Sequence, residues 1–483
     1  MKNKKLTLLG VLGCALISMA STSCGGSNNT DNTIYFWHTF GKDIYSRIDS
    51  MARKFEKLVL EKEGVEVHIA NLYDTYQGSY DDLIDKVTKS FTTGSTPTIC
   101  VAYPDHVATY LTYDKDGKSY VNDLDSYFTD PEIGFVKDDY LNPNGLGVED
   151  FVPSFIDEGR HYAKEGTYSL PFMKSTEIML YNKDVLNQVL FDLGIQQAAD
   201  VYMQNITWDA FMELLNYVND NLVKYFPNSA TQQVVPLFYD SDSNLFISQS
   251  YQRGIDFISM ENGEGSIDFN NPEAKAMVQE FKDLYDDGIL LTKATNGDKY
   301  GSDFFIANRC LFVVGSTGGT GYNDPKSNFE VGVCKFPVYK TATEEQSKYV
   351  SQGVTLCLMN NYGVSEEVNR FRTEYGWKFM KYITSTSNNI DASLASNGYI
   401  PSRLSCYEDE YYKEYLQYED FMSICAKTVI EEINGQYFNY PVFKGSDEAR
   451  NQVGGIVAEY LSDKNTDLDK LFETAVNNTR LKM

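Results

Sequence analysis

The stretch from residue 33 to residue 103 constrains the fold most, because it alternates short apolar segments with amphipathic ones. The apolar segments TIYFWH, VEVHIANL and TICVAY have the length and the β-branched and aromatic content of strands. Between the first two, apolar side chains recur at steps of three and four, which predicts a helix: Ile44, Ile48, Met51, Phe55 and Leu58. Between the last two, the same spacing from Tyr80 to Phe91 predicts a second helix.

This β-α-β-α-β series predicts a mostly parallel sheet covered by helices, with a ligand crevice at the carboxyl ends of its strands. The loops at 71–79 and 103–106 follow two of these strands, so we expect them near a site. Later segments are helix-rich, with further strand candidates LFVVG at 311–315 and GVTLCLM at 353–359. A chain of 483 residues is long enough for more than one lobe, and we predict a two-lobe α/β protein.

The first residues form a separate secretory segment. Three lysines precede an apolar run, Leu6 to Ala20, that is too short for a permanent membrane span. The run ends in STSC followed by a polar GGSNNTDNT stretch, which resembles a bacterial lipoprotein signal with Cys24 as the acylated residue. Ser21 departs from the leucine usual in that motif, so ordinary cleavage beside a bystander Cys24 stays an alternative. We expect a signal at 1–23, a tether at 24–32, and a lipid anchor on the outer face of the membrane.

Charge and cysteine content exclude several classes of protein. The 42 basic and 68 acidic residues give a net charge of −26, which argues against binding to nucleic acid. The eight cysteines include no CxxC, and the four histidines form no metal-ligand spacing, so we expect no metal and no cofactor. Six cysteines remain besides Cys14 in the signal and Cys24, and their spacing does not tell which of them, if any, are bridged: Cys100, Cys310, Cys334, Cys357, Cys406 and Cys425.

Enzyme signatures are missing from the sequence. No GxSxG, GxxxxGK[ST] or HExxH motif occurs, and no GxGxxG follows a strand. GSTGGTG at 315–321 follows a strand candidate but precedes a turn, so a nucleotide loop is not expected. Paired acids such as Asp81 and Asp82 fit a solvated face in so acidic a chain, which leaves a secreted carbohydrate-active enzyme as a minor alternative. We therefore predict a protein that is not an enzyme.

Several motifs, in order along the chain, carry a resemblance to a known family. They include FWHTFG (36–41), DFVPSF (150–155), LPFMKSTEIMLYNKDVL (170–186), NRCLFVVGST (308–317) and NGYIPSR (397–403). Together they resemble the extracellular solute-binding proteins of bacterial ABC importers. The branch they resemble most includes the sn-glycerol-3-phosphate-binding proteins, with maltose- and oligosaccharide-binding proteins as cousins.

The resemblance implies a periplasmic-binding-protein type II fold, in which two α/β lobes joined by a hinge close on a ligand between them. The chain would cross between the lobes near Pro171 and Phe172, near Gly353 and near Pro401. The N-terminal lobe would then hold 31–172 and 354–401, and the C-terminal lobe 173–353 and 402–483.

The resemblance also implies ligand contacts at positions that match the family's motifs. Where relatives have an acid just after the third strand's tyrosine, this chain reads Tyr103-Pro104-Asp105, so the acid is shifted to Asp105. The arginine position would pair with a phosphate, which suits its fork of charged donors. The seven expected ligand-binding residues are Tyr80, Asp105, Ser175, Ser316, Gly353, Tyr399 and Arg450.

The expected ligand is glycerol-3-phosphate or one of its diesters. A neutral mono- or oligosaccharide is the alternative, because Asp240 and Asp242 stand where relatives present tryptophans, and carboxylates suit sugar hydroxyls while repelling a phosphate. The partners implied are an ABC permease and the membrane through the lipid anchor, and the protein is expected to be a monomer.

Overall fold

The computed structural model describes residues 32–483, except 136–138, 144, 327 and 432–435. The expected signal at 1–23, Cys24 and the tether up to residue 31 lie outside the described residues. In the described part of the chain, no helix is both long and apolar enough to cross a membrane.

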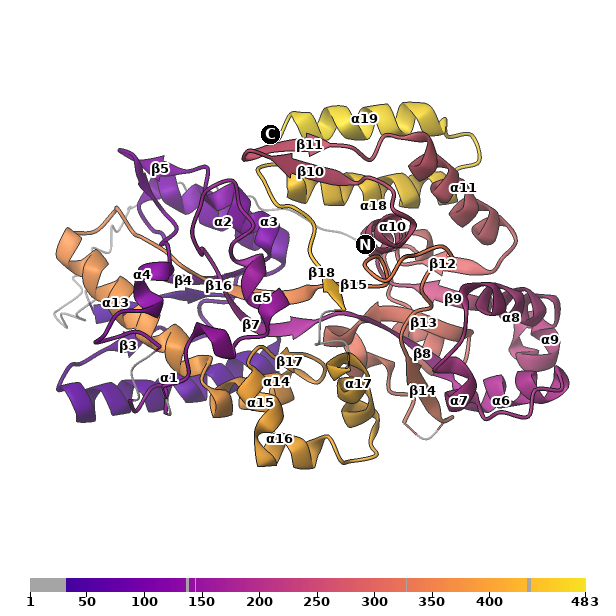
Figure 1. Ribbon diagram of the computed structural model, residues 1–483, viewed down its shortest axis with the longest axis horizontal. Helices are drawn as coiled ribbons and strands as arrows, with labels where there is room; N and C mark the ends of the chain where they lie inside the picture. Colours follow the sequence, from indigo (N-terminus) through magenta and orange to yellow (C-terminus); the bar gives the residue numbers. More distant parts are fainter. Residues whose placement is uncertain (1–31, 136–138, 144, 327, 432–435) are drawn as a thin grey trace, which may run out of the picture. The chain divides into compact units, whose positions relative to one another are not determined.

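Two five-stranded sheets organise the described chain (Figure 1). The first has the order β17-β7-β16-β4-β2 and the second the order β12-β9-β13-β8-β14. The strands of the first sheet are β2 (Phe36–Trp37), β4 (Ile99–Ala102), β7 (Leu170–Ser175), β16 (Gln352–Leu358) and β17 (Ile400–Pro401). Those of the second are β8 (Glu177–Asn182), β9 (Val235–Tyr239), β12 (Leu290–Thr292), β13 (Cys310–Ser316) and β14 (Val331–Cys334). The predicted two-lobe α/β architecture is thus confirmed.

Four small two-stranded sheets complete the strand pattern. They pair β1 (Thr33–Ile34) with β3 (His68–Ile69), β5 (Asp114–Lys115) with β6 (Lys118–Ser119), β10 (Ile258–Glu261) with β11 (Glu264–Ile267), and β15 (Tyr349–Val350) with β18 (Tyr437–Phe438).

The expectation of a mostly parallel sheet is wrong for the first sheet. Only β2 and β4 run parallel, while β16 pairs antiparallel with β4 and with β7, and β17 pairs antiparallel with β7. The parallel pair comes from the opening βαβ series, whereas the other three strands return from distant parts of the chain. A local pattern cannot reveal the direction of such returning strands.

Helices α1 and α2 begin and end where local chemistry requires. Ser79 caps α2 by accepting from the Asp82 N–H, and the Asp82 carboxylate accepts from the Ser79 N–H, a complete capping box. Gly64 and Gly94 end α1 and α2 with left-handed backbone at φ 70° and 71°, a conformation that favours glycine.

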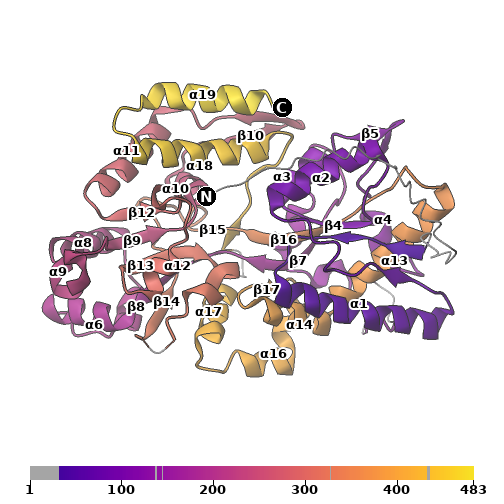
Figure 2. The same ribbon diagram turned by 180° about the vertical axis from the view of Figure 1, so that it is seen from behind.

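The helices of the first lobe cover both faces of its sheet (Figure 2). In both views α1 and α14 lie on one side of the sheet, and α2 and α3 on the other, while α13 packs against α1, α14 and β16. The bounds are α1 (Lys42–Glu63), α2 (Tyr80–Thr93), α3 (Pro104–Tyr110), α4 (Asp125–Phe128), α5 (Pro153–Glu158), α13 (Glu366–Ile383) and α14 (Thr386–Ser396).

The helices around the second sheet include a group formed by α10, α11, α18 and α19, which pack on one another. The bounds are α6 (Lys183–Asp192), α7 (Ala199–Met203), α8 (Trp208–Asp220), α9 (Leu222–Tyr225), α10 (Asp242–Arg253), α11 (Pro272–Asp286), α12 (Ser302–Ile306), α18 (Ser446–Ser462) and α19 (Leu468–Arg480). Three shorter helices follow β17: α15 (Leu404–Glu408), α16 (Glu410–Tyr415) and α17 (Phe421–Ile430).

Each sheet has its own large hydrophobic core. One cluster gathers β4, β7 and β16 with α1, α2 and α13, and another gathers β8, β9 and β13 with α8, α11, α18 and α19. The chain passes from the first sheet to the second at Thr176, between β7 and β8. It leaves the second sheet after β14 and re-enters the first sheet at β16, directly after the short strand β15. The exact lobe boundaries at 172, 353 and 401 stay predictions.

Candidate ligand-binding site

A cavity of about 930 Å³ lies where the two sheets meet. It is lined from the first sheet by residues after β4, at the end of β7 and at the start of β16. From the second sheet it is lined by residues after β9 and at the end of β13. Four of these strands, β4, β7, β9 and β13, present their carboxyl ends, where open α/β sheets bind ligands. A cavity of this volume suits a small organic solute.

The structure brings six of the seven expected residues to this cavity and leaves one behind its wall. The lining includes Asp105, Ser175, Ser316, Gly353, Tyr399 and Arg450. Tyr80 does not line the cavity. Its ring stacks on Tyr103, with centroids 4.0 Å apart, and Tyr103 is the ring that lines it.

Tyr103 is not among the seven expected ligand-binding residues, although the sequence already placed its loop, 103–106, near a site. Tyr103 is the residue between β4 and α3, so its ring lies at the carboxyl end of a central strand. Burial raises the pKa of Tyr103, so its hydroxyl stays protonated and can donate a hydrogen bond. Its position directly after the apolar strand ICVA is the signal that could have identified it.

Arg450 on α18 is held by a relay of hydrogen bonds that starts from a buried acid. The Glu177 carboxylate accepts from Asn244 Nδ2 at 2.9 Å, which orients the amide so that Asn244 Oδ1 accepts from Arg450 Nη2. Tyr239 also donates to Glu177, at 2.7 Å. Burial raises the pKa of Glu177 to about 7, although these hydrogen bonds and the Arg450 charge oppose that rise. The relay turns the guanidinium of Arg450 toward the cavity.

Lys174 on β7, another cation in the cavity wall, is already paired. Its Nζ lies 2.5 Å from the Glu158 carboxylate, and both side chains are almost fully buried. It also lies over the Phe155 ring, 5.4 Å from its centroid. A buried pair of this kind keeps its charge satisfied, so Lys174 has little charge left to attract a ligand.

At Gly353 the backbones of β16 and β7 lie close together. Gly353 faces Lys174 across the β16–β7 ladder and has a left-handed φ of 101°. A Cβ there would come within 2.4 Å of the Met173 carbonyl oxygen, so only glycine fits. Because Gly353 has no side chain, the backbone of β16 itself forms part of the cavity wall here.

Ser175 and Ser316 lie side by side, at the ends of β7 and β13. Ser316 Oγ is 3.4 Å from Ser175 Oγ, and it also accepts from the Gly318 N–H at 3.3 Å. The two hydroxyls therefore offer adjoining polar groups, one from each sheet.

Tyr399 reaches across from the end of α14 to the loop after β13. A Cβ on Gly318 would lie 2.9 Å from the Tyr399 ring, so the ring lies directly against that glycine. Asn397, with φ 55°, and Gly398, with φ 156°, make the turn that directs it there. This contact links the NGY motif to the second lobe at the cavity wall.

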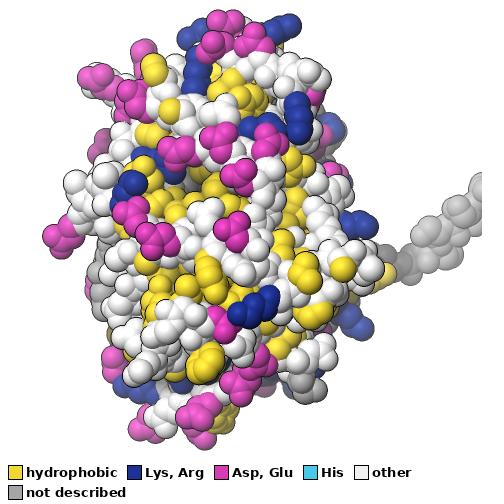
Figure 3. Space-filling model, turned by 90° about the vertical axis from the view of Figure 1, so that its right-hand side faces the viewer, with side chains coloured by type: hydrophobic (Ala, Val, Ile, Leu, Met, Phe, Trp, Pro, Cys, Tyr) yellow, Lys and Arg dark blue, Asp and Glu magenta, His cyan; other side chains and the backbone are white. Residues whose placement is uncertain are grey.

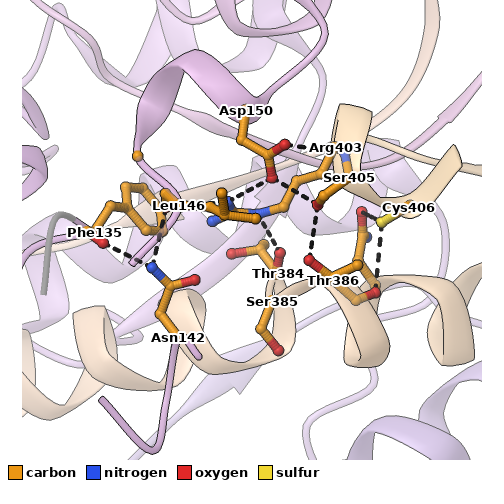
Figure 4. A network of polar contacts seen from close by, with 12 residues as sticks. Phe135, Asn142, Leu146, Asp150, Thr384, Ser385, Thr386, Arg403, Ser405 and Cys406 are labelled. Carbon is orange, nitrogen blue, oxygen red and sulfur yellow. Dashed lines mark hydrogen bonds and ion pairs between the residues drawn. The ribbon is translucent and has the colours of Figure 1, made fainter. Parts of the chain in front are cut away.

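Arg403 anchors the chain directly after β17, away from the cavity (Figure 4). Its fully buried guanidinium donates to the Thr384 carbonyl at 2.6 Å and pairs with Asp150 at 3.1 Å. It lies between the Phe135 and Phe151 rings, 4.8 and 4.3 Å from their centroids. The third crossing between the lobes is expected near Pro401. Arg403, two residues later, is still bonded to the first lobe.

Three further features concern the expected chemistry. The six cysteines in the described part of the chain are all free and buried. Within the described residues, no group of three His, Cys, Asp or Glu side chains is arranged to hold a metal ion. On the face drawn in Figure 3, Lys and Arg are scattered among acidic and hydrophobic side chains.

Other lining residues were also missed by sequence reasoning. Asp240 and Asp242 were expected to suit sugar hydroxyls only if the ligand is a saccharide, and of the two Asp240 lines the cavity whereas Asp242 does not. Asn244 and Tyr440 carry no motif of their own, because the first lies within α10 and the second follows a two-residue strand. The long-range packing of α10 against α18 places Asn244 beside Arg450, whereas Tyr440 lies in the segment between β18 and α18.

The comparisons with known proteins agree with this geometry. Residues 51–420 match the family model of the bacterial extracellular solute-binding proteins, and the chain belongs to that family. The family consists of binding proteins that serve ABC importers.

Individual relatives are more distant. The sn-glycerol-3-phosphate-binding periplasmic protein UgpB of Escherichia coli is 22% identical over 393 residues, covering 79% of this chain and 77% of the relative. UgpB of Mycobacterium tuberculosis, solved with glycerophosphocholine, has a TM-score of 0.65 at 15% identity, covering 93% of this chain and 97% of that one. The GacH receptor of Streptomyces glaucescens, solved unliganded and with acarbose, has a TM-score of 0.65 at 18% identity, with the same coverage. At these identities the solved structures show the shared fold.

Proposed function

We propose that this protein captures glycerol-3-phosphate or a glycerophosphodiester outside the cell membrane and delivers it to an ABC permease. The observation that carries the proposal is Arg450. It lines the cavity, and among the described residues no carboxylate lies within ion-pair distance of it. Its neighbours are the Asn244 amide and the Tyr440 hydroxyl, which leave other donors of the guanidinium fork for a ligand.

A phosphate group suits these donors. Arginine binds phosphate through two parallel charge-assisted hydrogen bonds, which give both energy and orientation. Tyrosine hydroxyls beside it can donate further bonds, and burial raises the pKa of Tyr440 to about 12, so that hydroxyl stays protonated. The adjoining Ser175 and Ser316 hydroxyls and the Asp105 carboxylate suit the glycerol hydroxyls.

A neutral saccharide is the second candidate, and the carboxylates favour it. Asp105 and Asp240 line the cavity, and carboxylates accept hydrogen bonds from sugar hydroxyls while repelling a phosphate. The negative charge of Asp105 also interacts electrostatically with the Arg450 guanidinium. The GacH structure with acarbose belongs to a protein of the same fold.

Titration calorimetry on ligand-stripped protein decides between the two candidates. For a phosphate ligand, Arg450→Ala should weaken binding by about 2–5 kcal/mol, the cost of removing one partner of a hydrogen-bonded charge pair, and affinity should fall as salt rises. Arg480→Ala, which removes an exposed cation at the end of α19, is the matched control and should change little. Wild-type protein that binds sugars and ignores glycerol-3-phosphate would refute the phosphate ligand.

We further propose that Cys24 carries a lipid that holds the protein on the outer face of the membrane, as a monomer beside its permease. The support is the STSC sequence after a short apolar run. A Cys24→Ala protein made in a bacterial host should move to the soluble fraction and lose fatty-acid labelling, while Cys406→Ala should do neither. Membrane retention with continued labelling of Cys24→Ala would contradict the anchor.

A further inference from the structure

The cavity is much larger than the glycerol phosphate proposed for it. A glycerol phosphate of about ten non-hydrogen atoms fills roughly 300 Å³ if each takes the volume of a water molecule. The cavity measures about 930 Å³. With its phosphate on Arg450, such a ligand would leave most of the cavity to water. The lining of the remaining space therefore bears on what else the solute carries.

Two exposed tyrosines line the part contributed by loops of the second lobe. Tyr300 precedes α12 and is 57% exposed, and Tyr322 lies in the 3-10 turn after β13 and is 79% exposed. Binding becomes more favourable when a ligand covers large aromatic side chains that are otherwise exposed to water. Both rings border the same cavity, so one bound solute could cover them.

The loop that carries Tyr300 is held firmly. The Gly301 N–H donates to the Asp240 carboxylate at 2.6 Å. A Cβ on Gly301 would lie 2.5 Å from the Phe238 ring and 2.8 Å from Val313, so the loop packs directly on β9 and β13. Tyr300 is thus presented from a fixed backbone, which lowers the entropy cost of binding.

The charges around these rings indicate which chemical group fits. Asp298 and Asp303 line the cavity beside Tyr300, together with Lys299. Lys293 Nζ lies 4.6 Å from the centroid of the Tyr300 ring, so that ring already has a cation against it. A second cation would be repelled by the two lysines, and a second phosphate by the two aspartates. Hydroxyl groups can donate to the aspartates, while an uncharged ring stacks on a tyrosine.

We infer that Asp298, Tyr300, Asp303 and Tyr322 form an outer subsite that takes an uncharged, hydroxylated ring. The inference rests on the proposed function for the inner end of the cavity. With a phosphate site at Arg450 and this outer subsite, the preferred solute is a glycerophosphodiester whose second alcohol is a ring polyol or a sugar, rather than glycerol-3-phosphate itself.

The test is calorimetry on the full mature chain with three probes: glycerol-3-phosphate, glycerophosphoinositol and glycerophosphocholine. Wild-type protein should bind the inositol diester about tenfold more tightly than the other two, an increment expected of ring stacking with hydroxyl hydrogen bonds. Tyr300→Ala and Tyr322→Ala should bring the ratio of the inositol diester's affinity to that of glycerol-3-phosphate toward one. Tyr73→Ala, which removes a 70% exposed tyrosine that does not line the cavity, should leave the ratio unchanged.

Two results would overturn the outer subsite. One is a preference for the choline diester. The other is that Tyr300→Ala lowers the affinity for the inositol diester and for glycerol-3-phosphate by the same factor. Failure of the proposed function is distinguishable, because wild-type protein would then bind none of the phosphate probes. If it instead bound di- or trisaccharides, and Tyr300→Ala weakened these more than a monosaccharide, the subsite would stand while the phosphate ligand failed.

Discussion

Gly353 shows how a single residue shapes the junction of the sheets. Its left-handed φ of 101° and the Met173 carbonyl, 2.4 Å from where a Cβ would lie, both oppose any side chain. We expect Gly353→Ala to lower the free energy of unfolding by about 1–3 kcal/mol, measured by urea denaturation, and to weaken ligand binding. Gly455→Ala is the matched control, because Gly455 is an exposed position in α18 with open space around its Cα. That change should raise stability by about 0.5–1 kcal/mol. Equal effects of the two substitutions would contradict the close approach of β16 and β7.

At the scale of elements, Arg403 ties the end of β17 to the first lobe (Figure 4). Without the charge of Arg403, the Asp150 carboxylate, whose side chain is only 10% exposed, keeps its two hydrogen bonds from Ser405 but loses its cation. We therefore expect Arg403→Met to lower the free energy of unfolding by about 3–5 kcal/mol, seen as a lower midpoint in thermal and urea unfolding. The double variant Arg403→Met with Asp150→Asn should recover part of that loss, because no buried charge is then left unpaired. A single variant as stable as wild type would show that the network does not anchor the strand.

At the scale of the whole molecule, Glu177 makes stability depend on pH. Burial raises the pKa of Glu177 to about 7 from 4.5, so the folded protein binds a proton here that the unfolded chain releases above about pH 4.5. Stability from this group is therefore lost as pH rises from about 5 to 8, by roughly 3 kcal/mol at most. Asp240, whose pKa burial raises to about 6, acts in the same direction over a lower range. Urea unfolding of the ligand-free protein at pH 5 and pH 8 measures the difference, and Glu177→Gln should reduce it. A protein more stable at pH 8 than at pH 5, with no change in Glu177→Gln, would contradict the raised pKa.

The sequence by itself determined the elements and much of the site. Apolar periodicity located α1, α2, β4, β13 and β16, because side-chain spacing reports directly on a helix face or a buried strand. The family motifs, in turn, pointed to six of the residues that line the cavity. Six of the seven predicted residues reach it, since strand ends and the turns after them hold fixed places in such a fold.

The tertiary structure alone decided the rest. It set three pairings of the first sheet antiparallel, because those strands return from distant parts of the chain. It placed Tyr103 on the cavity wall with Tyr80 behind it, a choice between two stacked rings that no spacing encodes. It also joined Arg450 to Asn244, which lies 206 residues away along the chain. Local patterns report what each segment does by itself, whereas a ligand cavity is made by side chains that only the packing of separate elements brings together.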